Sequence, residues 1–356
     1  MTPIVTSLLS NDLYKFTMWQ PMLHLMPANQ AEYRFVCRNQ PAFPLAELKA
    51  ELEAELHALC QLRFSEDELS YLGSLRYIKP DFVDYLRIFQ YQSRYLRVDT
   101  RGDELLASAV GPQIHTTGFE MPVLYIINEL YCRRLDQDAS LKEARSRLAA
   151  KVDLLKNADL PNHRHPFEFF DFGLRRRFSS AWHEEVVSTL HREVPNYFRG
   201  TSNVYLAKKL GITPIGTMAH EYLQTWQAAG VPLRKFQHAA LESWVQEYRG
   251  DLGTALTDVV GMDAFVKDFD LYFAKLFDGL RHDSGDPYVW ARKAIGAYTR
   301  MRIDPHTKRL VFSDALTFPK AIDLYRSFGD QTQTGFGIGT DLTNDTGAPP
   351  LQIVMK

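Results

Sequence analysis

The chain has 356 residues, of which 45% are hydrophobic and 24% are charged, and its formal net charge is −2. This composition is that of a globular protein long enough for one large domain or two moderate ones. A net charge so close to zero gives no overall electrostatic field that would attract nucleic acid or anionic membranes. We therefore expect small-molecule partners that bind to local clusters of charged residues.

The sequence predicts a soluble, cytoplasmic protein. Its start, MTPIVTSLLSNDLYKF, lacks the basic region and unbroken apolar core of a secretion signal. The longest apolar stretch, near residues 121–127, ends at an Asn-Glu pair and is too short to cross a membrane. Cys37, Cys60 and Cys132 have neither CxxC spacing nor the density of a disulfide framework, which indicates free thiols in a reducing compartment.

The first part of the chain has the pattern of an α+β layer. It contains one strand-like run, AEYRFVCR, followed by helix-like patterns and an extended pair. The helix-like patterns cover residues 45–62, 66–72 and 80–89, and the extended pair covers residues 95–97 and 105–109. A helical stretch over residues 124–155 then leads to the polar corner PNHRHP.

From residue 169 onward, short apolar runs each end in small, acidic or basic residues. These runs are FFDFGLRRR, YFRGTSNV, PIGTMAHE, LFDGLRHDSGDP, LVFSDALTF and GFGIGTD. Helix-compatible stretches over residues 203–209, 221–229 and 319–327 separate several of the runs, which favours parallel strands with crossover helices. We therefore predict an α/β fold of the (β/α) barrel type, with one site where the strands end.

The sharpest local signal is HDSGDP, where two carboxylates lie three residues apart. Asp283 and Asp286 are suited to binding sugar hydroxyls, or Mg²⁺ through water, and Gly285 lets a ligand approach the backbone. The alternative is a turn whose Asp side chains cap a helix over residues 288–297. Arg281 on the same turn favours the functional interpretation.

Three alternate glycines in GFGIGTD suggest a loop whose backbone N–H groups bind phosphate. The hydroxyl of Thr340 would lie beside Gly337 and Gly339 in such a loop. The spacing is not GxGxxG and the lysine of a P-loop is missing, so a tight glycine turn is the preferred explanation when this string is taken alone.

Two further strand ends carry polar side chains. Because neighbouring side chains on a strand alternate, at most two of Arg175, Arg176 and Arg177 would face one ligand, and at least one would lie at the surface. Ser313 and Asp314 follow another apolar run, and the alternative there is a cap for the next helix.

His220 in GTMAHE stands beside a carboxylate near a predicted strand end. Imidazole is both a titratable base and a nucleophile that forms covalent intermediates. Gln224 occupies the place of the second histidine of HExxH, so a zincin site is excluded. The alternative is a structural histidine.

Near the start, the motif NDLYKFTM contributes Tyr14 and Lys15 as candidate residues. Ordinary core packing explains most of this motif.

Taken together and in this order, NDLYKFTM, DFGLRRR, GTSNV, GTMAHE, LRHDSGDP, VFSD and FGIGT resemble the motifs of nicotinate phosphoribosyltransferases over nearly the whole chain. The resemblance implies a type II phosphoribosyltransferase, with an N-terminal α+β domain on an irregular (β/α) barrel. It divides the chain into residues 1–120, joined by residues 347–356, and a connector and barrel over residues 121–346. The acidic DDxxTG loop of type I enzymes is absent.

Enzymes of this family join nicotinate to 5-phosphoribosyl-1-pyrophosphate in NAD biosynthesis. The products are nicotinate mononucleotide and pyrophosphate, and the reaction is coupled to ATP hydrolysis. The resemblance therefore implies ATP as a co-substrate and Mg²⁺ associated with the substrate phosphates.

The resemblance also implies roles for individual residues. His220 matches the histidine that ATP phosphorylates, Asp283 the carboxylate on the ribose hydroxyls, and Arg281 an arginine near the pyridine carboxylate and the phosphates. Phe172 and Tyr14 match aromatic side chains on the two faces of the pyridine ring. The remaining matched positions are Arg175 near the carboxylate and phosphates, Thr201 and Ser202 in GTSNV, and Asp314, Gly337, Gly339 and Thr340 around the 5′-phosphate.

Ser202 bears on the choice between two pyridines. Related nicotinamide enzymes resemble this segment but carry an aspartate there, which repels nicotinate and accepts an amide N–H, whereas serine donates to nicotinate's carboxylate. The acid is therefore the expected substrate. In relatives the partner of Phe172 often comes from a second subunit, so a homodimer is compatible with the resemblance, and whether Tyr14 acts in cis or in trans stays open.

Family members continue past the equivalent of PPLQIVMK, so a shortened chain is expected here.

Two other interpretations of the function stay open. One is a different pyridine phosphoribosyltransferase or a sugar-phosphate barrel enzyme. The other is a catalytically weak nicotinate- or nucleotide-binding protein.

Overall fold

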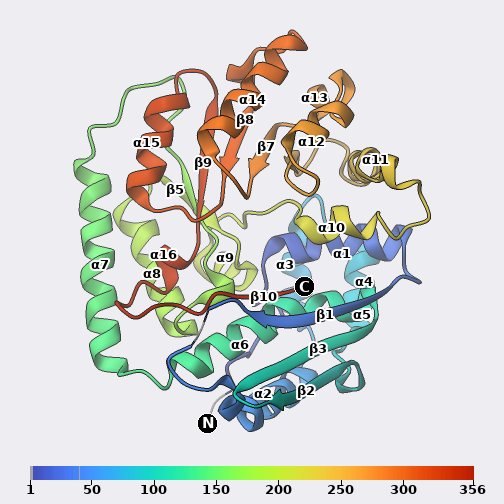
Figure 1. Cartoon of the computed structure of the whole chain (residues 1–356), viewed down its shortest axis with the longest axis vertical. Helices are drawn as coiled ribbons and strands as arrows, with labels where there is room; N and C mark the ends of the chain where they lie inside the picture. The colour runs from blue at the N-terminus through green and yellow to red at the C-terminus, as the bar shows by residue number, and fades with distance from the viewer. Residues whose placement is uncertain (1–2, 40) are drawn as a thin grey trace.

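The computed structural model describes residues 3–39 and 41–356. Its strands form two sheets, and Figure 1 shows the antiparallel sheet below the parallel one. The antiparallel sheet has the order β10-β1-β3-β2 and consists of β1 (Gln30–Cys37), β2 (Leu96–Arg101), β3 (Glu104–Pro112) and β10 (Ile353–Met355). The parallel sheet has the order β5-β4-β9-β8-β7-β6 and consists of β4 (Phe169–Asp171), β5 (Phe198–Thr201), β6 (Thr254–Leu256), β7 (Gly279–His282), β8 (Arg309–Phe312) and β9 (Gln333–Ile338).

The antiparallel sheet buries one face, as the alternation along β3 requires. Leu105, Ala107 and Ala109 are buried, whereas the side chains between them are more exposed. The last strand, β10, pairs with β1, so the end of the described chain extends the N-terminal sheet. The helices of this part are α1 (Leu13–Leu25), α2 (Lys49–Gln61), α3 (Glu66–Ser74), α4 (Pro80–Ile88), α5 (Gln113–Thr116) and α6 (Glu120–Cys132).

The parallel sheet is wound by crossover helices, and an extended segment joins its two edge strands. Ile215 N donates to the carbonyl of Thr201 at the end of β5 (2.8 Å), and Thr217 Oγ1 donates to the carbonyl of Thr254 in β6 (2.9 Å). The extended segment over residues 212–219 thus closes the barrel without adding a regular strand. The helices of this part are α7 (Gln137–Asn157), α8 (Ser180–Glu193), α9 (Val204–Leu210), α10 (His220–Thr225), α11 (Phe236–Tyr248), α12 (Met262–Asp268), α13 (Leu271–Leu276), α14 (Pro287–Arg300), α15 (Phe318–Phe328) and α16 (Thr340–Thr343).

The predicted architecture, an irregular (β/α) barrel with an N-terminal α+β part, is confirmed. The helical connector differs in detail, because residues 124–155 form α6 and α7 with a break between them. The carboxylate of Asp136 accepts a hydrogen bond from Ala139 N and so starts α7 as a separate helix.

The cysteines are free thiols, as predicted, with Cys60 and Cys132 buried and Cys37 half-buried. Among the residues that the structure describes, no helix combines the length and the apolar character needed to cross a bilayer.

Candidate active site

The carboxyl ends of the parallel strands bring most of the predicted positions to one edge of the barrel. Phe172 follows β4, Ser202 follows β5, Asp283 follows β7, Asp314 follows β8 and Gly339 follows β9. Strands that run in the same direction end at the same edge, so these residues share one rim. The N-terminal helix α1 begins there too, because its first backbone N–H donates to the carbonyl of Ser202 (2.8 Å).

His220 is the first residue of α10 and lies between two carboxylates. Its Nε2 is 2.9 Å from Oδ1 of Asp258, and its Nδ1 is 3.7 Å from Oδ2 of Asp283. The imidazole side chain is 37% exposed, so the ring remains accessible to a ligand. A carboxylate beside each ring nitrogen is suited to an imidazole that gains and loses positive charge.

Asp258 is a residue of this cluster that the sequence analysis did not identify. It follows β6, and its Oδ2 accepts a hydrogen bond from Ser284 Oγ (2.6 Å). Burial raises the pKa of the Asp258 carboxyl, but the contacts with His220 outweigh burial and the pKa lies below its ordinary value. The sequence held the signal, because the run TALTD ends in an acidic residue as the other runs do.

The two carboxylates of HDSGDP have different surroundings. Asp283 Oδ1 accepts a hydrogen bond from Ser313 Oγ (2.6 Å), and its Oδ2 lies 3.4 Å from Nη2 of Arg281. Arg281 Nη1 donates to the carbonyl of Met218 (2.9 Å), two residues before the histidine of the cluster. Asp286 instead accepts hydrogen bonds from the first backbone N–H groups of α14, so it is the helix cap of the alternative interpretation.

A buried lysine joins α1 to the segments beside His220. The Lys15 side chain is fully buried, and its Nζ forms ion pairs with Glu120 of α6 (2.5 Å) and with Glu221 of α10. Burial lowers the pKa of Lys15, but the two carboxylates outweigh it and hold the pKa well above its ordinary value. Glu221 also accepts a hydrogen bond from the hydroxyl of Tyr33, so this network ties α10 to the N-terminal sheet.

The glycines of GFGIGTD make room for aromatic rings. A Cβ atom on Gly337 would lie 2.3 Å from Cδ2 of Phe172, and one on Gly335 would lie 2.8 Å from Cε2 of Phe170. The prediction of a glycine loop is therefore wrong for these two glycines, which lie inside β9, and only Gly339 lies beyond the strand. Glycine at every second position leaves one face of β9 free of side chains, and the two rings fill that face.

The prediction that three arginines alternate along a strand is also wrong. A 3-10 turn, η4 (Leu174–Arg176), follows β4, so the residues do not alternate. Arg175 lies toward the rim, with its Nη2 3.7 Å from Glu120 Oε1. Arg176 donates to a carbonyl of β10 and Arg177 stacks on a tyrosine of α6, so neither is a free surface residue.

The hydroxyls of GTSNV are bonded within the protein. Ser202 is buried, and its Oγ donates to Oδ1 of Asp12 (2.6 Å). Thr201 Oγ1 donates to Oδ2 of Asp171 (2.6 Å). Tyr14 lies two residues after Asp12, in the first turn of α1, so this helix brings an aromatic ring and a carboxylate to the same strand end.

The buried carboxyl of Asp12 has a raised pKa of about 6. Burial is the main cause, and Asp171 and Glu120 raise the pKa further, whereas Ser202 and Arg175 lower it. Because the folded protein holds this proton more tightly than the unfolded chain, the free energy of unfolding falls as the pH rises from about 4 through 6.

We expect Asp12→Asn to remove this loss of stability. The difference in free energy of unfolding, variant minus parent, should increase by up to about 3 kcal/mol as the pH rises from about 4 to about 7. Urea denaturation across this range measures the difference. Asp84→Asn, at a carboxylate that is 72% exposed, is the control and should follow the parent curve. Parallel curves for Asp12→Asn would contradict the raised pKa.

Two adjacent strand ends supply the groups predicted for the 5′-phosphate. Asp314 follows β8 and precedes Ala315, whose φ of 46° is unfavourable for alanine and marks a constrained turn. Ser313 donates to a carbonyl of β7 and to the Asp283 carboxylate, so it does not cap α15. Gly339 and Thr340 start α16 at the end of the neighbouring strand.

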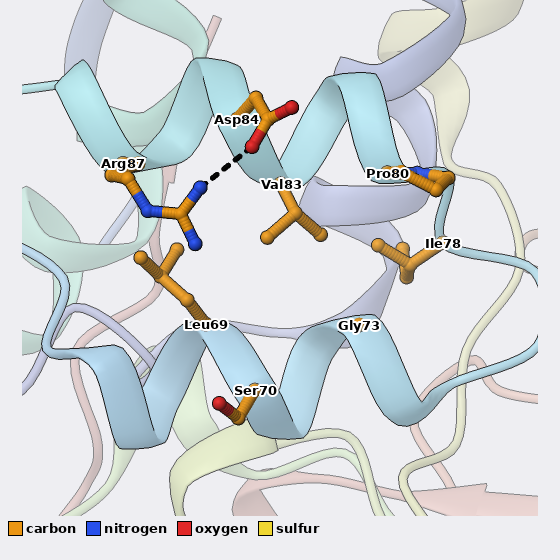
Figure 2. Close-up of a pocket in the computed structure, with 8 residues that line it drawn as sticks. All are labelled: Leu69, Ser70, Gly73, Ile78, Pro80, Val83, Asp84 and Arg87. Carbon is orange, nitrogen blue, oxygen red and sulfur yellow. Dashed lines mark hydrogen bonds and ion pairs between the residues drawn. The ribbon is translucent and has the colours of Figure 1, made fainter.

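A groove between α3 and α4 is separate from this rim. It has a volume of about 270 Å³. Figure 2 shows Leu69, Ile78 and Val83 lining it, with an ion pair between Arg87 Nη1 and Asp84 Oδ1 (2.6 Å) at one side. None of the residues predicted for the site lines this groove.

The barrel and its polar rim are those of a (β/α) barrel enzyme. Two family models match the chain: the nicotinate phosphoribosyltransferase (NAPRTase) N-terminal domain over residues 9–128, and the nicotinate phosphoribosyltransferase (NAPRTase) family over residues 167–356. A curated nicotinate phosphoribosyltransferase from Herminiimonas arsenicoxydans is 67% identical and the match covers 100% of this chain and 90% of the relative. The corresponding protein of Chromobacterium violaceum is 59% identical, with coverage of 100% and 89%.

Solved structures agree with these matches. The nicotinate phosphoribosyltransferase of Vibrio cholerae superposes with a TM-score of 0.93 at 34% identity, covering 100% of this chain and 86% of that one. The Porphyromonas gingivalis enzyme gives a TM-score of 0.92 at 36% identity, covering 99% and 90%. The chain belongs to the nicotinate phosphoribosyltransferase family. Its activity is that of the family, in pyridine nucleotide biosynthesis, as the motifs predicted.

Proposed function

We propose that this rim transfers the phosphoribosyl group to nicotinate and that ATP drives the transfer through a phosphoryl group carried on His220. The observation that carries the proposal is the partly exposed imidazole held between Asp258 and Asp283. A histidine with a carboxylate on each side is poised to act as a nucleophile rather than to fill the core. Arg281 beside Asp283 provides a cation for a phosphoryl oxygen.

The phosphorylation step assigns a role to each nitrogen of His220. The Asp258 carboxylate, 2.9 Å from Nε2, favours the tautomer with the proton on Nε2 and leaves a lone pair on Nδ1. That lone pair forms a bond to the γ-phosphorus of ATP as the bond to the bridging oxygen breaks, and ADP leaves with the electron pair. The positive charge that develops on the imidazole is stabilised by Asp258.

The transfer step needs orientation more than acid–base chemistry. The lone pair of the pyridine nitrogen attacks ribose C1 as the C1–O bond breaks, and pyrophosphate leaves with the electron pair, so no proton moves. We propose that Phe172 and Tyr14 hold the pyridine ring and that Asp283 holds the ribose hydroxyls. Arg281 then stabilises charge on the phosphates, and Arg175 binds the pyridine carboxylate.

The 5′-phosphate is proposed to lie where β8 and β9 end. Gly337, also predicted for this phosphate, lies inside β9 and clears space for Phe172; beyond the strands, Gly339 N–H, the Thr340 hydroxyl and Asp314 are the groups at this end. Water takes no part in the transfer itself. Attack of water on the phosphoryl group of His220 afterwards breaks the N–P bond and releases inorganic phosphate, which completes the ATP cycle.

Mg²⁺ fits the donor set of the rim as an ion that arrives with the substrate phosphates. Among the described residues there is no group of three or more side chains arranged to hold a metal ion by themselves. Asp258 and Asp283 are rim carboxylates, and Mg²⁺ is commonly bound through one or two carboxylates together with substrate phosphates and water. When bound, the ion neutralises charge on the leaving pyrophosphate.

The preference for the acid is proposed to depend on Ser202 and Asp12. When Asp12 is ionised, the Ser202 hydroxyl donates its only proton to Asp12 Oδ1 (Oγ to Oδ1, 2.6 Å). When Asp12 is protonated, the same hydroxyl is free to donate to nicotinate's carboxylate.

We propose that Tyr14 serves the site of its own chain, because the backbone of α1 is bonded to Ser202 of the same chain. We also propose that the protein forms a homodimer. A cytoplasmic location is proposed because free thiols are typical of a reducing compartment.

Product analysis with nicotinate and nicotinamide side by side, with and without ATP, tests the proposal. We expect nicotinate mononucleotide from nicotinate, a marked increase in rate when ATP is present, and little product from nicotinamide. Conversion of neither pyridine would favour a binding protein, and preferential use of nicotinamide would contradict the role of Ser202.

A further inference from the structure

A buried carboxylate outside the reacting groups lies directly before Phe172. Asp171 is the last residue of β4, and its side chain and that of His183, from α8, are both fully buried. His183 Nε2 donates to Asp171 Oδ2 (2.7 Å) and Thr201 Oγ1 donates to the same oxygen (2.6 Å). The other oxygen, Oδ1, accepts a hydrogen bond from Gly173 N (2.8 Å).

We propose that Asp171, His183 and Thr201 form a positioning triad that sets the geometry of the pyridine site without touching the substrate. The proposal deepens the function proposed above, because it rests on Phe172 being the residue that stacks on the ring. None of the three side chains is exposed, so each acts through the residue that follows it or through its hydrogen bonds.

The cost of burying Asp171 makes a purely passive role a poor explanation. Moving a carboxylate out of water costs several kcal/mol unless partners compensate. Burial raises the pKa of Asp171, but His183, Thr201 and Gly173 outweigh burial and hold the pKa below its ordinary value, so the group stays ionised. In the described part of the chain, His183 Nδ1 has no hydrogen-bond partner, so the polar contact of this ring is with Asp171 alone.

The triad fixes the two strand ends on which the ring site is built. The Asp171 carboxylate holds the turn at Gly173 and thereby the backbone on both sides of Phe172. The Asp171 carbonyl accepts a hydrogen bond from Ser202 N (2.9 Å), and Thr201 Oγ1 accepts one from the N–H of Asn203 (3.1 Å). One buried charge thus sets the spacing between the end of β4 and the end of β5.

The position of the triad predicts an effect on the pyridine site but not on His220. The contacts of His220 are with Asp258 and Asp283, at the ends of β6 and β7, and none of them includes a member of the triad. Loss of the triad should therefore weaken nicotinate binding and leave the reaction with ATP intact. A general loss of structure would affect both.

Asp171→Asn tests this separation in the full-length protein. The amide must turn its NH₂ toward a donor, because both oxygens of Asp171 accept hydrogen bonds. We expect the KM for nicotinate and its directly measured Kd to rise about 10- to 100-fold, and the rate at which ATP labels the protein to change less than about twofold.

Conservative and disruptive variants of His183 provide a second test. His183→Gln retains an N–H donor and should restore most of the nicotinate affinity, whereas His183→Leu should match Asp171→Asn. Glu247→Gln and His24→Leu are the matched controls. Glu247 is also a buried carboxylate bonded to a histidine (Oε1 to His24 Nδ1, 3.0 Å), but this pair joins α11 to α1 and not the ends of β4 and β5. They should lower thermal stability without a selective rise in the Kd for nicotinate.

The outcomes separate this inference from the proposed function. Unchanged nicotinate affinity in Asp171→Asn, equal losses of nicotinate binding and ATP labelling, or a His183→Gln variant as weak as His183→Leu would each overturn the triad. If the parent protein is never labelled by ATP, the phosphohistidine proposal fails, but the Kd measurements, with thermal unfolding as the check on folding, still decide the inference.

Discussion

Asp258→Asn should slow the ATP-dependent phosphorylation of His220 by about 10²- to 10⁴-fold in a protein that remains folded. The carboxylate lies 2.9 Å from Nε2, so its charge is available as positive charge develops on the imidazole. An amide keeps the shape of the side chain but not the charge, and it no longer fixes the tautomer that leaves the lone pair on Nδ1. Single-turnover labelling with γ-labelled ATP measures the rate.

Asp286→Asn is the matched control for this prediction. Asp286 is a neighbouring acidic residue, but it caps α14 and has no contact with His220. Asparagine is as good an N-cap as aspartate, so stability should change by only a few tenths of a kcal/mol and labelling should keep its parent rate. Labelling of Asp258→Asn at the parent rate would contradict the role assigned to Asp258.

Gly337→Ala should raise the KM for nicotinate by about 10-fold or more, because it displaces the ring of Phe172. The added Cβ would lie 2.3 and 2.4 Å from two atoms of that ring, closer than any non-bonded contact allows. The ring must move away from β9 and into the space proposed for the pyridine. We also expect an overpacking cost of about 1–3 kcal/mol in stability. Steady-state kinetics and urea denaturation measure the two effects.

A second glycine and a double variant make the result specific. Gly73→Ala, in α3, meets Val83 Cγ2 at an ordinary distance of 3.8 Å and should stabilise the protein by about 0.5–1 kcal/mol with no change in KM. Adding Gly337→Ala to Phe172→Ala should cost little further affinity, because the ring it displaces is already gone. Additive losses in the double variant would show that Gly337 acts by another route.

Much of the fold followed from local patterns in the sequence. The helix over residues 80–89 is predicted from its periodicity and is found as α4, because Pro80 at the first turn and a clear apolar face agree. The ladder of apolar runs ending in polar residues likewise predicted the rim, because parallel strands must end together. Asp258 was missed although TALTD ends in an acidic residue as the other runs do, because nothing local shows that this short strand, β6, lies beside His220.

The errors come from long-range packing, which local patterns do not contain. GFGIGTD is predicted as a loop because glycine ends regular structure locally, but its first two glycines lie in β9 and make room for the rings of Phe170 in β4 and Phe172 just after it. Ordinary core packing is the expectation for most of NDLYKFTM, and nothing in that motif indicates that Lys15 pairs with Glu120 and Glu221, which are 105 and 206 residues away in sequence. No local pattern joins a lysine to carboxylates so distant.

The central claim is that a phosphorylatable imidazole lies between the carboxylates that follow β6 and β7. Incubation with γ-labelled ATP followed by peptide mapping tests it most directly. We predict one acid-labile, base-stable label on the peptide that contains His220, absent from His220→Asn and discharged faster when nicotinate and phosphoribosyl pyrophosphate are added. An unlabelled parent protein, or a label that persists in His220→Asn, would contradict the claim.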